Sequence, residues 1–148
     1  MFVLALFALP VCISDWRYRR IPNIYLLYML YLILAIRLFV GVQSIAVIFC
    51  AAFFAALLTR TGMGAGDAKL FGITALALNL PNFGALSLLV AAMYVVAILQ
   101  VLLMWLFSTE FPRSIPMAPA IFLGSALYLA ASMSPSLRQY ADALVNSW

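Results

Sequence analysis

Residues 83–107 read FGALSLLVAAMYVVAILQVLLMWLF, a run of 25 residues without a single charged side chain. Because a helix of about 20 mostly apolar residues can cross the hydrocarbon core of a bilayer, this run predicts a transmembrane helix. The whole chain of 148 residues has the same character: 68% is hydrophobic, only 8% is charged, and the mean hydropathy is +1.18. Soluble domains carry about 25% charged residues. The composition therefore predicts an all-α integral membrane protein.

Five further apolar segments accompany this run, separated by short polar or proline-containing stretches. The N-terminal segment is short for a membrane span. Pro22 suits the first turn of the next helix, because a proline lacks an N–H that would stay unpaired there. We expect about six transmembrane helices in a single domain that occupies residues 1–148. The apolar segments are residues 1–14, 22–40, 44–58, 67–80, 83–107 and 117–133.

The C-terminal residues 136–148 have a different pattern. Leu137, Tyr140, Leu144 and Trp148 recur at helical spacing on one face, and polar residues occupy the other positions. This pattern predicts an amphipathic helix that lies on the membrane surface.

Basic residues are concentrated in alternate connections between the apolar segments. If the N-terminus lies outside, only Arg37 and Arg138 fall near the outer face. Cytoplasmic connections of membrane proteins are enriched in lysine and arginine, so this orientation is the expected one. The net charge of +4 is spread over short connections, and we expect no nucleic-acid partner. The basic residues expected at the cytoplasmic face are Arg17, Arg19, Arg20, Arg60, Lys69 and Arg113.

Asp15 and Asp67 are two of only four acidic residues, and each stands where an apolar segment meets a charged stretch. The predicted orientation places both at the cytoplasmic face, although 52 positions separate them in the sequence. An ionisable side chain beside hydrocarbon is costly and usually marks a functional site. These two aspartates are therefore the strongest candidates for functional residues.

The residue types present exclude most other catalytic chemistries. Without histidine, neither a Ser-His-Asp nor a Cys-His site can form. Cys12 and Cys50 lie far apart in apolar segments, where we expect buried small hydrophobes and neither a disulfide nor a zinc site. Lys69 has no obvious serine partner, and the glycine-rich residues 62–66 follow no predicted strand, which argues against a dinucleotide site. A pair of carboxyl groups remains.

Two neighbouring carboxyl groups can hydrolyse a peptide bond without a metal or a cofactor. One keeps a proton and polarises the carbonyl, while the other is ionised and accepts a proton from the attacking water. Two simpler interpretations stay open: Asp67 could be a helix N-cap, and Asp15 could pair with Arg17 or Arg19. The glycines before Asp67 favour the catalytic interpretation, because glycine permits unusual backbone angles and the close approach of another chain.

At these positions the chain resembles the type IV prepilin peptidases. The first motif is residues 15–23, DWRYRRIPN, and the second is residues 62–70, GMGAGDAKL, which contains Gly-x-Gly-Asp. Residues 115–120, IPMAPA, are similar to the proline-containing start of the family's last helix. The resemblance implies a membrane aspartic endopeptidase at the cytoplasmic face of a bacterial inner membrane, with Asp15 and Asp67 as its catalytic pair. Its substrates are prepilins or pseudopilins, cut between the basic leader and the hydrophobic segment.

The resemblance also sets expectations for the domain organisation. The first motif begins at Asp15, as in short forms associated with tight-adherence (Flp-type) pili. We therefore expect no methyltransferase activity, no cysteine-rich zinc region and no cofactor. The competing hypotheses are an ion-coupled transporter or channel that uses the two aspartates, and a noncatalytic membrane factor for pilus assembly.

Lys69 and Asn23 are candidates for support of the site. Lys69 could steady Asp67, contact the substrate or anchor its helix at the interface. Asn23 could form a hydrogen bond near Asp15 or cap the second helix.

Gly64 and Gly66 are candidates for substrate access, for the reasons given above. Glu110 could meet a basic leader or be a solvated loop charge. The three arginines of the first motif are expected to set the topology, since they would repel a basic leader.

Overall fold

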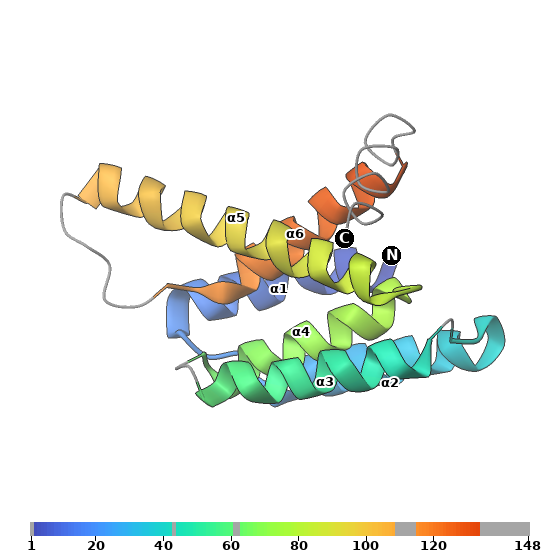
Figure 1. Cartoon of the computed structure of the whole chain (residues 1–148). Helices are drawn as coiled ribbons and strands as arrows, with labels where there is room; N and C mark the ends of the chain where they lie inside the picture. Colours follow the sequence, from blue (N-terminus) through green and yellow to red (C-terminus); the bar gives the residue numbers. More distant parts are fainter. Residues whose placement is uncertain (1, 43, 61–62, 109–114, 134–148) are drawn as a thin grey trace.

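The computed structural model describes residues 2–42, 44–60, 63–108 and 115–133, which form six α-helices (Figure 1). Within these ranges there is no β-strand, so the prediction of an all-α protein is confirmed. The predicted C-terminal amphipathic helix, residues 136–148, lies outside the described residues. The helices are α1 (Phe2–Tyr18), α2 (Asn23–Val40), α3 (Ile45–Arg60), α4 (Ala65–Leu78), α5 (Phe83–Ser108) and α6 (Met117–Met133).

The observed helices extend beyond the predicted apolar segments at their polar ends. α1 continues to Tyr18 and α3 to Arg60, because a helical backbone needs no apolar side chain to propagate. α4 begins at Ala65, which places Asp67 inside its first turn. Pro22 is the N-cap of α2 and lies just before the first turn, with an extended backbone at φ −60° and ψ 128°.

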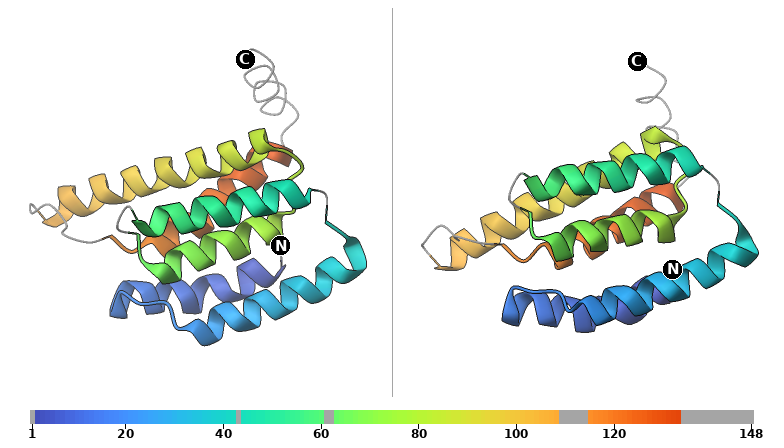
Figure 2. Two further views of the ribbon diagram at one scale, coloured as in Figure 1. Left: turned by 60° about the horizontal axis from the view of Figure 1, so that its bottom comes forward. Right: turned by 90° about the horizontal axis from the view of Figure 1, so that it is seen from below.

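α4 is the innermost helix, although it is the shortest of the six. It packs against α2, α3 and α6, and seven of its 14 residues are buried. Phe71 is fully buried and meets the ring of Phe54 from α3 edge to face, with the ring centroids 5.9 Å apart. α1 packs against α2 and α6, and α5 runs along α6 (Figure 2). The helix that carries Asp67 is therefore held on several sides.

Two helices are long and apolar enough to cross a membrane: α2, with 18 residues, and residues Phe83–Phe107 of α5, with 25. α3 and α6 are also apolar but shorter. Large apolar side chains face outward, and Phe49 and Phe53 of α3 are 70% and 72% exposed. Apolar surfaces of this extent usually mark contact with lipid or with a partner. The structure thus supports helices that span a membrane, while the six-span topology and its orientation stay predictions.

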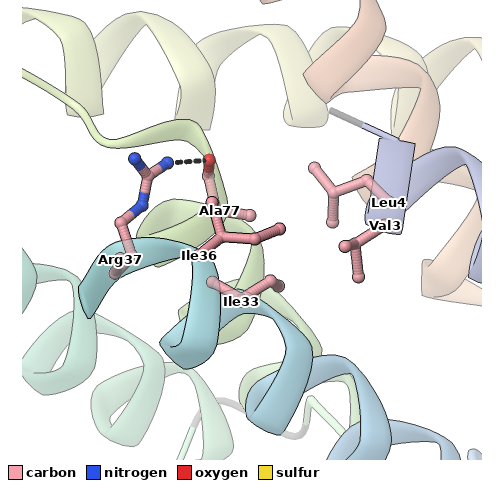
Figure 3. Close-up of a pocket in the computed structure, with 6 residues that line it drawn as sticks. All are labelled: Val3, Leu4, Ile33, Ile36, Arg37 and Ala77. Carbon is pink, nitrogen blue, oxygen red and sulfur yellow. Dashed lines mark hydrogen bonds between the residues drawn. The ribbon is translucent and has the colours of Figure 1, made fainter. Parts of the chain in front are cut away.

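The C-terminal end of α4 is held by a side chain from α2. The guanidinium of Arg37 donates hydrogen bonds to the carbonyl of Leu76, at 3.1 Å, and to that of Ala77 (Figure 3). Apolar side chains of α1 and α2 surround this contact, among them Val3 and Ile33. The last carbonyls of a helix have no partner within it, and a cation there also complements the helix dipole. Arg37 therefore fixes the end of α4 opposite Asp67.

We expect the substitution Arg37→Met to lower the free energy of unfolding by about 1–3 kcal/mol, because it leaves carbonyls in a half-buried site without their charged donor. Chemical denaturation in detergent micelles measures this change. Arg37→Lys keeps a cation at the helix end and should cost less.

Arg60→Met is the matched control, because Arg60 is exposed in the last turn of α3. A surface change of this kind is expected to stay within about 0.5 kcal/mol of the parent protein. Equal losses for Arg37→Met and Arg60→Met would contradict the role given to Arg37.

Candidate active site

Asp15 lies in the last turn of α1 and is buried, with only 4% of its surface exposed. Its Oδ2 accepts a hydrogen bond of 2.9 Å from the backbone N–H of Ala118, 103 positions further along the chain. Ala118 is the second residue of α6, and the N–H of Met117 also donates to the Asp15 carboxylate. The start of α6, which the sequence marked only by its prolines, is therefore part of the site.

This contact meets a need of α6. The first N–H groups of a helix have no acceptor within the helix itself. Pro116, which precedes α6, has no side-chain oxygen that could accept from them. Asp15 reaches across from α1 and provides the acceptor that an N-cap residue usually provides, and its negative charge suits the positive end of the helix dipole.

The arginines after Asp15 do not account for its environment. Arg17 lies over the ring of Tyr18, 5.6 Å from the ring centroid. The charge of Arg19 lowers the pKa of Asp15, as do the hydrogen bonds from α6, but burial has the larger effect and raises this pKa above its ordinary value. Pairing with Arg17 or Arg19 therefore does not fully explain the position of Asp15, because its carboxylate is also bound to the N-terminus of α6.

Asp67 is the third residue of α4 and not its N-cap, so that interpretation is wrong. The N-cap is Gly64, and no side chain provides a capping hydrogen bond there. Oδ1 of Asp67 is buried and has no hydrogen-bond partner among the described residues. Burial raises the pKa of Asp67 to about 7, and the charge of Asp15 contributes to this rise. A buried carboxyl oxygen without a partner has no structural explanation and is typical of a functional site.

The two carboxyl groups share one site. The charge of Asp15 acts on Asp67 and raises its pKa, as expected for two carboxyl groups that lie close together. They lie at the polar ends of α1 and α4, outside the two helices that are long and apolar enough to span a membrane. The start of α6 lies at the same end of the bundle (Figure 2). The structure thus brings together two of the residues that the sequence singled out.

Gly64 and Gly66 provide space for neighbouring parts of the same chain. A Cβ atom on Gly64 would stand 3.0 Å from Oδ2 of Asp67, and one on Gly66 would stand 3.3 Å from Cβ of Ile21. Their backbones are ordinary, since Gly64 has φ −58° and Gly66 is helical, so the expectation of unusual backbone angles is wrong. Gly66 lets the connection between α1 and α2 pack against the start of α4. The two sequence motifs are therefore in contact.

Lys69 and Asn23 contact each other. The Lys69 Nζ donates a hydrogen bond of 3.2 Å to Oδ1 of Asn23, which links the second turn of α4 to the first residue of α2. Asn23 is not the N-cap of α2, because Pro22 occupies that position. The pair braces the site from the side, and this role was not among the alternatives that the sequence suggested.

Ser14 is a site residue that the sequence did not indicate. Its hydroxyl donates to the carbonyl of Arg20 at 3.1 Å and so closes the turn after α1. In that turn Arg19 adopts a left-handed backbone with φ 52°, which is uncommon for a residue other than glycine. Ser14 precedes Asp15 but carries no motif signal. Gly62 and Glu110, also named from the sequence, lie outside the described residues.

A comparison with known protein families gives one match. The type IV leader peptidase family matches residues 2–127, which are most of the chain and include both aspartates. The family resemblance seen in the motifs is therefore confirmed. No curated protein and no solved structure matches the chain.

The unequal hydrogen bonding of the two aspartates predicts unequal effects on stability. Asp15→Ala removes the acceptor at the start of α6 and should lower the free energy of unfolding by about 0.5–2 kcal/mol. Asp15→Asn keeps an acceptor oxygen and should lose less.

Asp67→Asn should leave stability unchanged or raise it slightly, because it replaces an ionisable oxygen that is buried without a partner. Denaturation of the variants in the same detergent measures all three effects. Equal destabilisation by Asp15→Ala and Asp67→Asn would contradict this division.

Proposed function

We propose that this chain, which belongs to the type IV leader peptidase family, is a membrane aspartic endopeptidase. Its reaction is hydrolysis of the peptide bond between the cytoplasmic leader and the hydrophobic segment of prepilins or pseudopilins. The observation that carries the proposal is that Asp15 and Asp67, from two motifs far apart in sequence, lie close enough for the charge of Asp15 to raise the pKa of Asp67, with Asp15 buried and Asp67 half-buried. A pair of carboxyl groups is sufficient for peptide hydrolysis.

The hydrogen bonds assign a role to each carboxyl group. Hydrogen bonds from N–H groups favour the ionised form of a carboxyl group, and Asp15 receives them from the first turn of α6. The buried Oδ1 of Asp67 has no such donor among the described residues, so Asp67 is the better holder of the proton. Asp15 is thus the general base and Asp67 the general acid of the proposed reaction.

The proposed reaction has two steps. In the first, Asp15 accepts a proton from water as the water oxygen bonds to the scissile carbonyl carbon, and Asp67 gives its proton to the carbonyl oxygen. In the second, the carbon–nitrogen bond breaks, the proton on Asp15 passes to the leaving amine, and the hydroxyl proton returns to Asp67. Each carboxyl group ends in its starting state, and the only reagent consumed is water.

The charges near the site support a cytoplasmic location. Arg17, Arg20, Arg60 and Lys69 lie at the end of the bundle that carries the aspartates, where α1 and α3 end and α2 and α4 begin (Figure 1). Arg37 lies at the other end, but its charge is used to hold the carbonyls of α4. The position of Arg37 against the charge bias therefore has a structural cause, and the bias itself favours a cytoplasmic site.

The competing functions account for less of the structure. An ion pathway would place ionisable groups at mid-membrane depth, whereas Asp15 and Asp67 lie at helix ends. A noncatalytic assembly factor would give no reason for the unpartnered oxygen of Asp67. Hydrolysis gives a use to both groups.

We expect Asp15→Asn and Asp67→Asn each to reduce cleavage of a prepilin by a factor of about 10² or more, since each removes a proton-transfer group. Purified variants in lipid nanodiscs are incubated with a prepilin, and mass spectrometry measures the released leader. Asp142→Asn, the same change in the C-terminal segment, is the matched control and should cleave normally. Cleavage at the parent rate by either active-site variant would refute the carboxyl pair.

Chelation tests the proposal that no metal takes part. A chain with no histidine and two scattered cysteines offers a poor set of zinc ligands, so we expect EDTA and phenanthroline to leave the cleavage rate unchanged. The rate is measured with the same prepilin before and after dialysis against chelator. Loss of activity that added zinc restores would count against an aspartic mechanism.

A further inference from the structure

An apolar groove of about 390 Å³ lies between α2 and α3, and α4 forms its floor. Seen from below, α4 lies between these two helices (Figure 2). The floor residues Lys69, Gly72, Ile73 and Leu76 recur three or four positions apart, so they share one face of α4. Asp67 stands two positions before Lys69 and faces the other way. The groove is therefore separate from the carboxyl groups of the proposed reaction.

Gly72 keeps the floor of the groove open. A Cβ atom on Gly72 would have no neighbour within 4 Å among the described residues, whereas one on Gly124 would stand 2.7 Å from Cα of Met93. Close packing of helices thus explains Gly124 but not Gly72. Glycine destabilises the interior of a helix relative to alanine, so a glycine without a packing contact needs another reason. The space above Gly72 is that reason if a ligand occupies it.

Lys69 places a positive charge at one end of the groove. It is the only charged residue among the described residues of the lining. Its Nζ donates to Oδ1 of Asn23 at 3.2 Å, and because this amide is neutral, the bond leaves the charge of Lys69 uncompensated. No carboxyl group in the described part of the chain pairs with it. The free charge favours an anionic ligand.

The dimensions of the groove match one chain of a membrane lipid. From Lys69 to Leu76 the floor rises seven residues along α4, which is about 10 Å. The hydrocarbon of one bilayer leaflet is about 15 Å deep, so an acyl chain whose headgroup is at Lys69 would follow most of the floor. Leu27 in the wall is 47% exposed, so the groove is open toward the surroundings of the protein.

A lipid fits this groove better than a helix does. Two turns of a helix about 10 Å in diameter occupy roughly 800 Å³, about twice the volume of the groove. Arg20 and Arg60 stand at the same end of the bundle as Lys69, where the chain is expected to face the cytoplasm. The cytoplasmic leaflet contains the anionic lipids that basic pockets between membrane helices bind.

We propose that this groove binds an anionic phospholipid of the bilayer, with the lipid phosphate at Lys69 and one acyl chain over Gly72 between α2 and α3. The lipid contacts α2, α3 and α4 together, and so steadies the helix that carries Asp67 from the face opposite the site. The proposal does not depend on the peptidase reaction, and its tests measure lipid binding alone.

The first test measures the preference for an anionic headgroup. The parent protein in a mild detergent is titrated with phosphatidylglycerol or with phosphatidylcholine of the same acyl chains, and native mass spectrometry counts the bound lipids. We expect the first bound lipid to prefer phosphatidylglycerol about fivefold, since one lysine near an anionic headgroup contributes about that factor. Lys69→Gln should remove this preference, and Arg17→Gln, the same loss of charge on an exposed residue of α1, should keep it. Equal binding of both lipids by the parent protein would overturn the proposal.

The second test fills the groove. Gly72→Leu places a side chain in open space and improves helix propensity, so the variant should unfold in lipid-free detergent at the same temperature as the parent protein or higher. It should also lose the preferred lipid. Ala91→Leu, on an exposed position of α5, is the matched control and should keep it. A Gly72→Leu protein that binds phosphatidylglycerol as the parent does would contradict the assignment of the groove.

The third test identifies the occupant in a bilayer. A photoreactive benzoylphenylalanine replaces Leu27 in the groove wall, or Phe53 on the outer face of α3, in nanodiscs with equal amounts of the two lipids. Adducts at position 27 should be enriched in phosphatidylglycerol, while adducts at position 53 should follow the composition of the bilayer. The proposal fails if both positions follow the bilayer composition, or if position 27 reacts with a prepilin or with a second copy of the chain instead.

Discussion

The hydrogen bond from the N–H of Ala118 to Asp15 is the contact on which the site depends most. It joins α1 to α6 and gives a hydrogen-bond partner to a buried group on each helix. The N-terminus of α6 obtains an acceptor that Pro116 cannot provide, and a carboxylate with 4% exposure obtains donors that make its ionised form tolerable. An ionised carboxylate has about four lone-pair sites on its two oxygens, so it can accept these hydrogen bonds and still accept a proton. One residue can therefore be both a structural cap and the proposed general base.

The position of Asp67 depends in turn on how α4 is held. At its far end, Arg37 binds the carbonyls of Leu76 and Ala77, and at its near end Lys69 binds Asn23. Gly66 lets Ile21 approach the first turn. These contacts come from α2 and from the connection before it, so the segment that follows Asp15 in sequence also positions Asp67. The two motifs form one unit in space, which is consistent with a reaction that needs both carboxyl groups.

Composition was sufficient to predict the helical class and the approximate helix positions, because apolar segment length is a property of the sequence itself. The scarcity of acidic residues singled out Asp15 and Asp67, and their catalytic role stays a proposal. The partners of these residues could not be predicted in the same way. The donor to Asp15 is a backbone N–H, which every residue except proline possesses, and only the fold selects Ala118. Of the two reasons given for the glycines, unusual backbone angles are wrong for Gly64 and Gly66, and the contacts of Gly66 with Ile21 could not be predicted because close packing within the chain leaves no trace in the sequence.

The site lies where two kinds of surface meet. Trp16, next to Asp15 on α1, borders uncharged apolar surface of α5 and α6, while the end of α1 and the turn after it carry Arg17, Arg19 and Arg20. A substrate with a hydrophobic helix and a polar leader has the same division along its length. Burial of that helix in an apolar environment would favour a junction near the carboxyl groups, because apolar side chains cannot advance favourably into the polar end. The proposed enzyme would thus recognise the boundary between the apolar and polar parts of its substrate. The arginines would limit how far the substrate's hydrophobic helix can move toward the polar end. Cleavage position would then follow from solvation as much as from the residues that flank the bond.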